Sequence, residues 1–107
     1  MTSELGYPRN LLAVEKQLSE LPHLKNASGL PNRRVDVLCY AKGSMAPLLL
    51  IECKKGDEEA EGQVMGYNHF IGAPFVAVAR KGAAYLIHPE RLDFIPSYPQ
   101  LMEKICP

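Results

Sequence analysis

The sequence predicts an α/β domain built on a central mixed sheet of four strands flanked by helices. One segment shows apolar residues at helical spacing, a second has the start and stop signals of a helix, and two pairs of apolar runs have the length of strands. In chain order these segments read helix, strand, strand, helix, strand, strand, which is an α/β pattern. The 107 residues suffice for one core and are too few for two. Residues 1–107 are therefore expected to form a single domain.

The first helical pattern covers residues 11–21. Apolar side chains recur there at steps of three and four from Leu11 to Leu21, and Pro22 follows. This spacing predicts an amphipathic helix of about three turns. Glu15 borders the apolar stripe of that helix, so its carboxylate is expected to face inward.

The first pair of apolar runs covers residues 33–40 and 47–54. A short turn containing Gly43 joins them, which predicts an antiparallel hairpin. Both runs are apolar on both faces at their centres, so the sheet must be covered on each side. Helices are expected to supply that cover.

Charged residues appear at the polar ends of these two strands. Asp36 lies in the first strand, and Glu52 and Lys54 lie at the end of the second. Because successive strand residues point to opposite faces, Glu52 and Lys54 share a face and Cys53 points away. The two carboxylates and the ammonium group are therefore expected to converge on one spot.

The second half of the chain predicts a helix followed by another hairpin. Asp57 is the expected N-cap of a helix that ends at Gly72. Gly62 and Gly66 lie four residues apart on one face of that helix, which predicts close backbone packing there. The remaining elements are strands at 75–79 and 83–87, which form the hairpin, and a short final helix at 100–105.

Composition restricts the classes of function. Hydrophobic residues make up 47% of the chain and charged residues 22%, which is typical of a globular domain. No apolar run approaches the roughly 18 residues of a spanning helix, and the first residues lack a secretory signal, so a cytoplasmic location is predicted. The formal net charge is zero, which counts against avid, unassisted binding of nucleic acid. The three cysteines have no metal-ligand or redox spacing and are expected to be structural.

The converging charges suit metal-dependent hydrolysis of a phosphodiester. Such a reaction needs a divalent cation to polarise the phosphoryl group and to generate hydroxide. Magnesium prefers oxygen ligands, so Asp36 and Glu52 are the expected ligands, with the main-chain carbonyl of Cys53 as a third oxygen and manganese as the alternative ion. Lys54 is expected to orient the attacking water or help to deprotonate it, and to offset charge on the phosphate.

Taken together, these motifs resemble the PD-(D/E)XK nuclease superfamily, with Val35 in place of the usual proline. The strongest resemblance is to the N-terminal nuclease domain of type I restriction enzyme R subunits. That family shows a Tyr-Pro opening, a helical glutamate, a basic pair before an aspartate, an Ile-Glu-Cys-Lys strand and a Gln-x-x-x-Tyr helix. The corresponding residues here are Tyr7-Pro8, Glu15, Arg33-Arg34-Val35-Asp36, Ile51-Glu52-Cys53-Lys54 and Gln63-Val64-Met65-Gly66-Tyr67.

The resemblance implies a restriction-endonuclease-like core and a role for each motif. Asp36 and Glu52 would bind the metal, Lys54 would be catalytic, and Glu15 would add a supporting acid. Spacing supports one further implication, because residues four apart on a helix are neighbours. The expected substrate-binding residues are Gln63, Tyr67, Arg33 and Arg34.

The predicted function is metal-dependent endonucleolytic hydrolysis of DNA. The alternative is a non-catalytic module with a nuclease fold that binds DNA or assembles into a restriction complex, and its charged residues would then form strand-end salt bridges. The sequence has no Gly-x-x-x-x-Gly-Lys-Ser/Thr loop, which argues against an ATP site in this chain. The absence of any nucleotide fingerprint also disfavours a small metabolic enzyme. The expected partners are DNA and either a second copy of the chain or larger subunits of a restriction complex.

Overall fold

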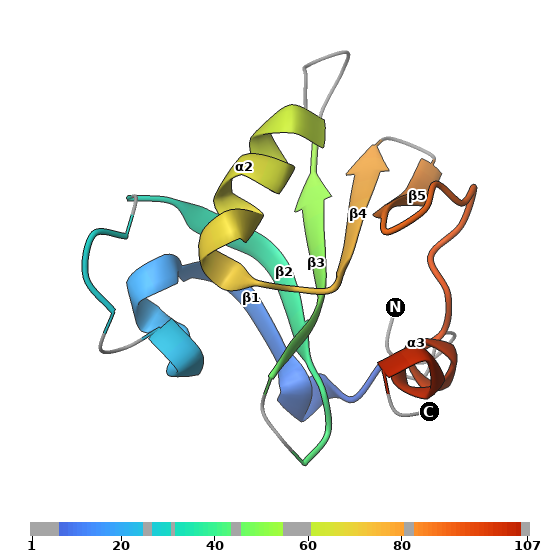
Figure 1. Ribbon diagram of the computed structural model, residues 1–107, viewed down its shortest axis with the longest axis horizontal. Coiled ribbons are helices and arrows are strands. Elements are labelled where there is room, and N and C mark those ends of the chain that lie inside the picture. Colours follow the sequence, from blue (N-terminus) through green and yellow to red (C-terminus); the bar gives the residue numbers. More distant parts are fainter. Residues whose placement is uncertain are drawn as a thin grey trace.

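The computed structural model describes residues 7–24, 27–30, 32–43, 46–54, 61–80 and 83–105, and for Pro22, Glu61 and Tyr67 the main chain alone. Within these residues the chain forms a five-stranded mixed sheet with two α-helices and three short 3₁₀ segments (Figure 1). The strands lie in the sheet in their sequence order, β1-β2-β3-β4-β5. The predicted α/β class is confirmed, whereas the predicted count of four strands is wrong.

The additional strand replaces the predicted first helix. Residues Arg9–Leu11 form a 3₁₀ segment (η1), Leu12–Gln17 form β1, and two further 3₁₀ segments follow at Leu18–Glu20 (η2) and Pro22–Leu24 (η3). Strand β1 pairs with β2 in an antiparallel register over its length. The observed order is therefore β-β-β-α-β-β-α, and Glu15 lies on a strand.

The two predicted hairpins form much as expected. Strand β2 (Arg34–Tyr40) pairs antiparallel with β3 (Pro47–Cys53), and β4 (Phe75–Arg80) pairs antiparallel with β5 (Ala83–His88). The two hairpins join through parallel pairing of β3 with β4, which makes the sheet mixed. Parallel neighbours need a long crossover connection, which usually contains a helix, and α2 lies in this connection.

Helix α2 (Glu61–Ile71) packs over β3 and β4. Its C-terminus is as predicted, with Gly72 at φ +80° directly after it. The predicted start near Asp57 lies outside the described residues. The predicted close packing is wrong at Gly66, because a Cβ there would meet no heavy atom of the described residues within 4 Å.

The core is continuous across the sheet because β3 is buried on both faces. All five residues from Leu48 to Glu52 are buried. Helix α2 covers one face, while Tyr7 and Tyr98 lie close to Cys39 on the other. Tyr98 opens α3 (Tyr98–Ile105), which confirms a short final helix.

The cysteines differ in their settings. Cys39 is buried, as expected for a structural thiol, but Cys53 is exposed. Cys106 lies outside the described residues. Among the helices that the structure describes, none has the length and apolar character needed to cross a membrane.

Candidate metal and phosphate site at the sheet edge

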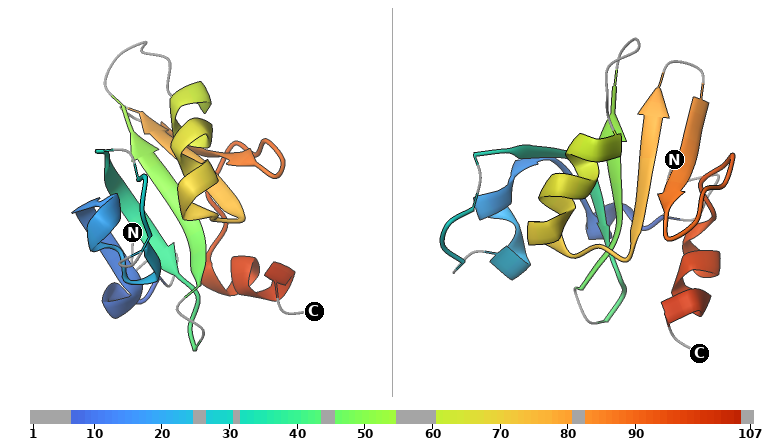
Figure 2. Two further views of the ribbon diagram at one scale, coloured as in Figure 1. Left: turned by 60° about the vertical axis from the view of Figure 1, so that its left-hand side comes forward. Right: turned by 45° about the horizontal axis from the view of Figure 1, so that its top comes forward.

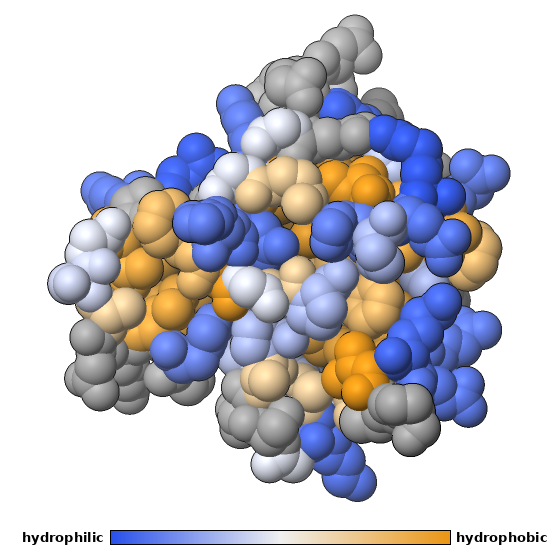
Figure 3. All heavy atoms as spheres, in the orientation of Figure 1, coloured by the Kyte–Doolittle hydropathy of each residue, from blue (hydrophilic) through white to orange (hydrophobic). Residues whose placement is uncertain are grey.

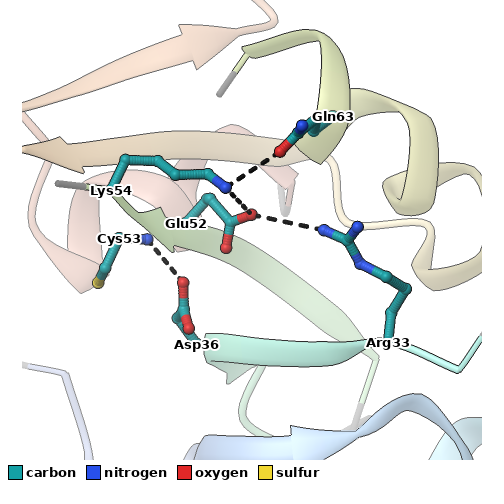
Figure 4. A network of polar contacts seen from close by, with 6 residues as sticks. All are labelled: Arg33, Asp36, Glu52, Cys53, Lys54 and Gln63. Carbon is teal, nitrogen blue, oxygen red and sulfur yellow. Dashed lines mark hydrogen bonds and ion pairs between the residues drawn. The ribbon is translucent and has the colours of Figure 1, made fainter. Parts of the chain in front are cut away.

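The site lies where β2 begins and β3 ends. These strands are antiparallel, and their register pairs Val37 with Ile51. Continuing that register by one residue places Asp36 opposite Glu52. Residues opposite each other in an antiparallel pair share a face, and their Cβ atoms lie about 5 Å apart. The fold therefore brings the two predicted acids together on neighbouring strands (Figure 4).

Glu52 is a buried carboxylate with cationic partners. The residue is 4% exposed. Its Oε2 lies 3.8 Å from a terminal nitrogen of Arg33 and 3.9 Å from Nζ of Lys54. A buried ionised carboxylate is costly unless it is paired, so these two cations lower the cost of placing it here. Figure 4 shows the Glu52 side chain directed toward both of them.

Lys54 is held in place by two elements. Its Nζ donates a hydrogen bond of 3.0 Å to Oε1 of Gln63, in the first turn of α2. Its main-chain N–H donates to the carbonyl of Ala79 on β4, at 2.9 Å. Lys54 is thus fixed between the end of β3, β4 and α2, with its ammonium group beside the Glu52 carboxylate.

Asp36 is anchored to the main chain of β3. The N–H of Cys53 donates to Oδ2 of Asp36 at 2.8 Å. This bond fixes the orientation of the carboxylate at the strand end. Burial, followed by the negative charges of Asp36 and Glu52, raises the pKa of the Cys53 thiol.

The remaining predicted residues lie around this cluster. Glu15 is exposed on β1, and the continuous register on either side of it places it opposite Asp36 in the ladder. Its φ of +53° is unusual for a residue with a side chain. Arg34 is exposed and pairs with Gln17 in the sheet. Tyr67 lies on α2 four residues after Gln63, but its side chain lies outside the described part of the chain.

The carboxylate oxygens of Asp36 and Glu52 are ligands that suit a hard divalent cation. Magnesium is commonly bound through one or two carboxylates and keeps several waters. Asp36 and Glu52 provide two carboxylates on adjacent strands. In the described residues, no group of three or more His, Cys, Asp or Glu side chains is placed to hold a metal ion. An ion here would need water or main-chain oxygen for its remaining positions, and the Cys53 carbonyl is the predicted candidate.

Sequence reasoning missed the contact between Arg33 and Glu52. Arg33 was expected to meet a phosphate, and in the structure its guanidinium group faces the buried acid. Arg33 directly precedes the strand that pairs with β3, but the contact follows only once the register of that pair is known. The antiparallel register brings the start of β2 to the end of β3, where Glu52 lies.

The fold and this cluster define an α/β domain with a carboxylate and lysine site at one edge of a mixed sheet. The sequence matches the family described as type I restriction enzyme R protein N terminus (HSDR_N) over residues 1–99. The chain belongs to this family, so it is an N-terminal domain of the R-subunit type, and the family implies the context of a restriction complex. The resemblance noted in the sequence is thereby confirmed. Searches of curated proteins and of solved structures gave no match.

Proposed function

We propose that the chain is a magnesium-dependent nuclease domain that hydrolyses DNA phosphodiester bonds. The observation that carries this proposal is the meeting of two carboxylates where β2 begins and β3 ends. Asp36 accepts a hydrogen bond from the N–H of Cys53, and Nζ of Lys54 lies 3.9 Å from Oε2 of the adjacent Glu52. Family membership supports it, because restriction systems act on DNA. In this proposal Asp36 and Glu52 hold the ion, with the carbonyl of Cys53 as a further ligand and manganese as an alternative ion.

Each residue has a role that follows from its contacts. A bound divalent cation would polarise the phosphoryl group and lower the pKa of a bound water. The Lys54 ammonium, oriented by Gln63, offsets negative charge that develops on the phosphate. The exposed guanidinium group of Arg33 can contact a phosphate oxygen while it neighbours Glu52.

The other predicted residues belong to the edges of the same site. Glu15 lies next to Asp36 in the ladder and would support metal binding through a shared water. Arg34 would bind the DNA backbone, as would Tyr67. A second copy of the chain would supply a second site for the opposite strand, which is why a homodimer remains part of the proposal.

The test compares cleavage of plasmid DNA by wild-type protein and by the variant Asp36→Asn. Asparagine keeps an oxygen that can accept the N–H of Cys53, so the substitution removes the charge with little change in structure. We expect wild-type protein to nick DNA with magnesium or manganese, and Asp36→Asn to be at least about 100-fold slower. Glu103→Gln, which neutralises an exposed carboxylate on α3, is the matched control and should cleave normally. Failure of wild-type protein to cleave any DNA would overturn the proposal.

Metal binding can be measured separately from cleavage. Magnesium that binds the folded chain at ten times its Kd would add about 1.4 kcal/mol to the free energy of unfolding. For a domain of this size that raises Tm by roughly 5 °C. Wild-type protein should show the shift and Asp36→Asn should not.

The second function to consider is a non-catalytic assembly or DNA-binding module. The observation that favours it is the pairing of Glu52 with Arg33 and Lys54, which balances the buried charge without a metal. Such a module would show no magnesium-dependent rise in Tm and no cleavage. The same two measurements therefore decide between the functions.

A further inference from the structure

A second charged cluster lies on the same face and at the same edge of the sheet as Glu52. The strand registers pair Glu52 with Val78 on β4, and Val78 with Tyr85 on β5. Residues paired in this way share a face, so Glu52, Val78 and Tyr85 form one row across three strands. Tyr85 is two strand spacings from Glu52, or about 10 Å along the sheet.

Arg80 extends the positive edge that Lys54 begins. Cys53 pairs with Ala79 in the parallel register of β3 and β4, so the next residues, Lys54 and Arg80, lie side by side at the ends of the two strands. By alternation, Arg80 shares its face with Val78 and Lys54 shares its face with Glu52. Nε–H of Arg80 donates to the Tyr85 hydroxyl at 3.2 Å, which directs the guanidinium group across β5.

Arg91 reaches the same tyrosine from the loop that follows β5. Leu92 exchanges two main-chain hydrogen bonds with Leu86, which folds the loop back along the strand. This return places the guanidinium carbon of Arg91 5.8 Å from the centre of the Tyr85 ring. Two arginines from separate elements therefore meet at one phenol. Figure 2 shows the loop on the same side of the sheet as α2.

The cluster borders a hollow that is open to solvent. Tyr85 and Arg91 line a surface hollow of about 280 Å³ together with Ala83, Leu92 and Asp93. Figure 3 shows hydrophilic residues along the upper right border of this face, over the region of β4, β5 and the following loop. Arg91 supplies positive charge to the hollow and Asp93 reduces it, while Arg80 lies beside the hollow through its hydrogen bond to Tyr85.

We propose that Arg80, Tyr85 and Arg91 bind the backbone of the DNA strand beyond the phosphate held at the Asp36 and Glu52 site. This inference rests on the proposed function for the identity of the ligand. A DNA strand carries one phosphate per about 3.4 Å of helix axis, so 10 Å of sheet edge spans up to three phosphates. Arginine is well suited to phosphate because its planar donors can bind two oxygens at once. The Tyr85 hydroxyl positions Arg80 and its ring positions Arg91.

The first test is binding of a fluorescent DNA duplex without divalent cations, across a series of salt concentrations. The variants are Arg91→Gln and the double variant Arg80→Gln with Arg91→Gln. The matched control is Arg9→Gln, an exposed arginine next to β1 at the opposite end of the sheet. We expect the double variant to weaken binding roughly tenfold and to reduce the slope of log Kd against log salt by about 2. The control should match wild-type protein, and Asp93→Asn should bind more tightly.

The second test locates the contact along the strand. A neutral methylphosphonate placed one to three nucleotides from a preferred cleavage position should slow cleavage by wild-type protein. The same replacement should cause no further loss in Arg91→Gln, because the partner of the phosphate is already absent. Additional loss of equal size in the variant would contradict the assignment.

The outcomes separate this inference from the proposed function. Wild-type binding that depends on Arg80 and Arg91, without cleavage under any metal, would overturn the nuclease proposal and support the backbone site. Normal cleavage together with an unchanged salt slope in the double variant would overturn the backbone site alone. Absence of DNA binding by wild-type protein would overturn both. Circular dichroism and Tm of each variant identify any loss of binding that comes from unfolding.

Discussion

The two ends of the sheet handle buried polar groups in opposite ways. At the end where β2 and β3 meet near α3, the polar groups are neutral and matched. The Tyr7 hydroxyl donates to the carbonyl of Pro96 at 2.6 Å, and the N–H of Lys42 donates to the Tyr98 hydroxyl at 2.7 Å. At the other end, a buried Glu52 is surrounded by charged side chains. One end is built for stability, and the other carries charge that a ligand can use.

This difference predicts that substitutions at the charged end mainly affect activity, whereas substitutions at the neutral end mainly affect stability. Neutral hydrogen bonds in the core contribute to stability and touch no substrate. Charges at the site are costly to bury, so they add little net stability even when they are paired. Substitutions and changes of pH at the two ends test that division, beginning with the largest expected effect.

Glu52→Gln should remove activity with little change in stability. The substitution neutralises the carboxylate and retains its shape, so we expect cleavage to fall at least about 100-fold. The free energy of unfolding should change by no more than about 1 kcal/mol, because the two cations that remain are partly exposed to water and Lys54 keeps its hydrogen bond to Gln63. Cleavage assays and urea denaturation measure the two quantities. The control is Glu90→Gln, which breaks an exposed ion pair with Lys104 at 3.9 Å, the distance between Lys54 and Glu52. It should change neither cleavage nor the free energy of unfolding. A Glu52→Gln variant that cleaves at the wild-type rate would remove Glu52 from the site.

Stability at the opposite end should fall in alkaline solution. Burial raises the pKa of the Cys39 thiol from 9.0 to about 12 and that of the Tyr40 phenol from 10.0 to about 12, and burial followed by the charge of Cys39 raises the pKa of Tyr7 as well. Above the unfolded-state pKa values, the unfolded chain releases protons that the folded chain retains. The free energy of unfolding should therefore decrease between about pH 9 and pH 12, by up to about 1.4 kcal/mol per pH unit for each group.

Cys39→Ala isolates the thiol part of this effect. The variant should be less stable at every pH because the residue is buried, but its stability should decrease less steeply above pH 9. Urea denaturation at several values between pH 8 and pH 11 gives both slopes. Equal slopes in the variant and in wild-type protein would show that the thiol is not held protonated by the fold.

The sequence predicted the charged end well because local rules determine it. Strand alternation is enough to place Glu52 and Lys54 on one face, and the hairpin is enough to bring Asp36 near them. The contact of Arg33 with Glu52 was missed because it depends on the register between two strands. Register is a pairing between distant residues, and spacing along a single strand does not reveal it.

The largest error in the predicted fold was the first helix, which is a strand in the structure. As with the Arg33 contact, the reason is a pairing between two strands. Leu11, Leu18 and Leu21 are buried, as their spacing predicted, but Val14 is 53% exposed. The buried leucines lie in or beside 3₁₀ segments on either side of a short strand. Strand β1 pairs with β2 along one edge, and that tertiary pairing overrides the local helical pattern.

Tyr7→Phe should give the smallest effect, and it completes the comparison between the two ends. Removing the hydroxyl leaves the Pro96 carbonyl without its buried donor, so we expect a loss of about 1–2 kcal/mol in the free energy of unfolding. DNA binding and cleavage by the folded fraction should stay at the wild-type level. Tyr85→Phe is the matched substitution at the charged end, where the hydroxyl meets Arg80 at a partly exposed position. It should weaken DNA binding with a change in stability below about 0.5 kcal/mol. If Tyr7→Phe altered DNA binding as much as Tyr85→Phe, the two ends would not be separate in function.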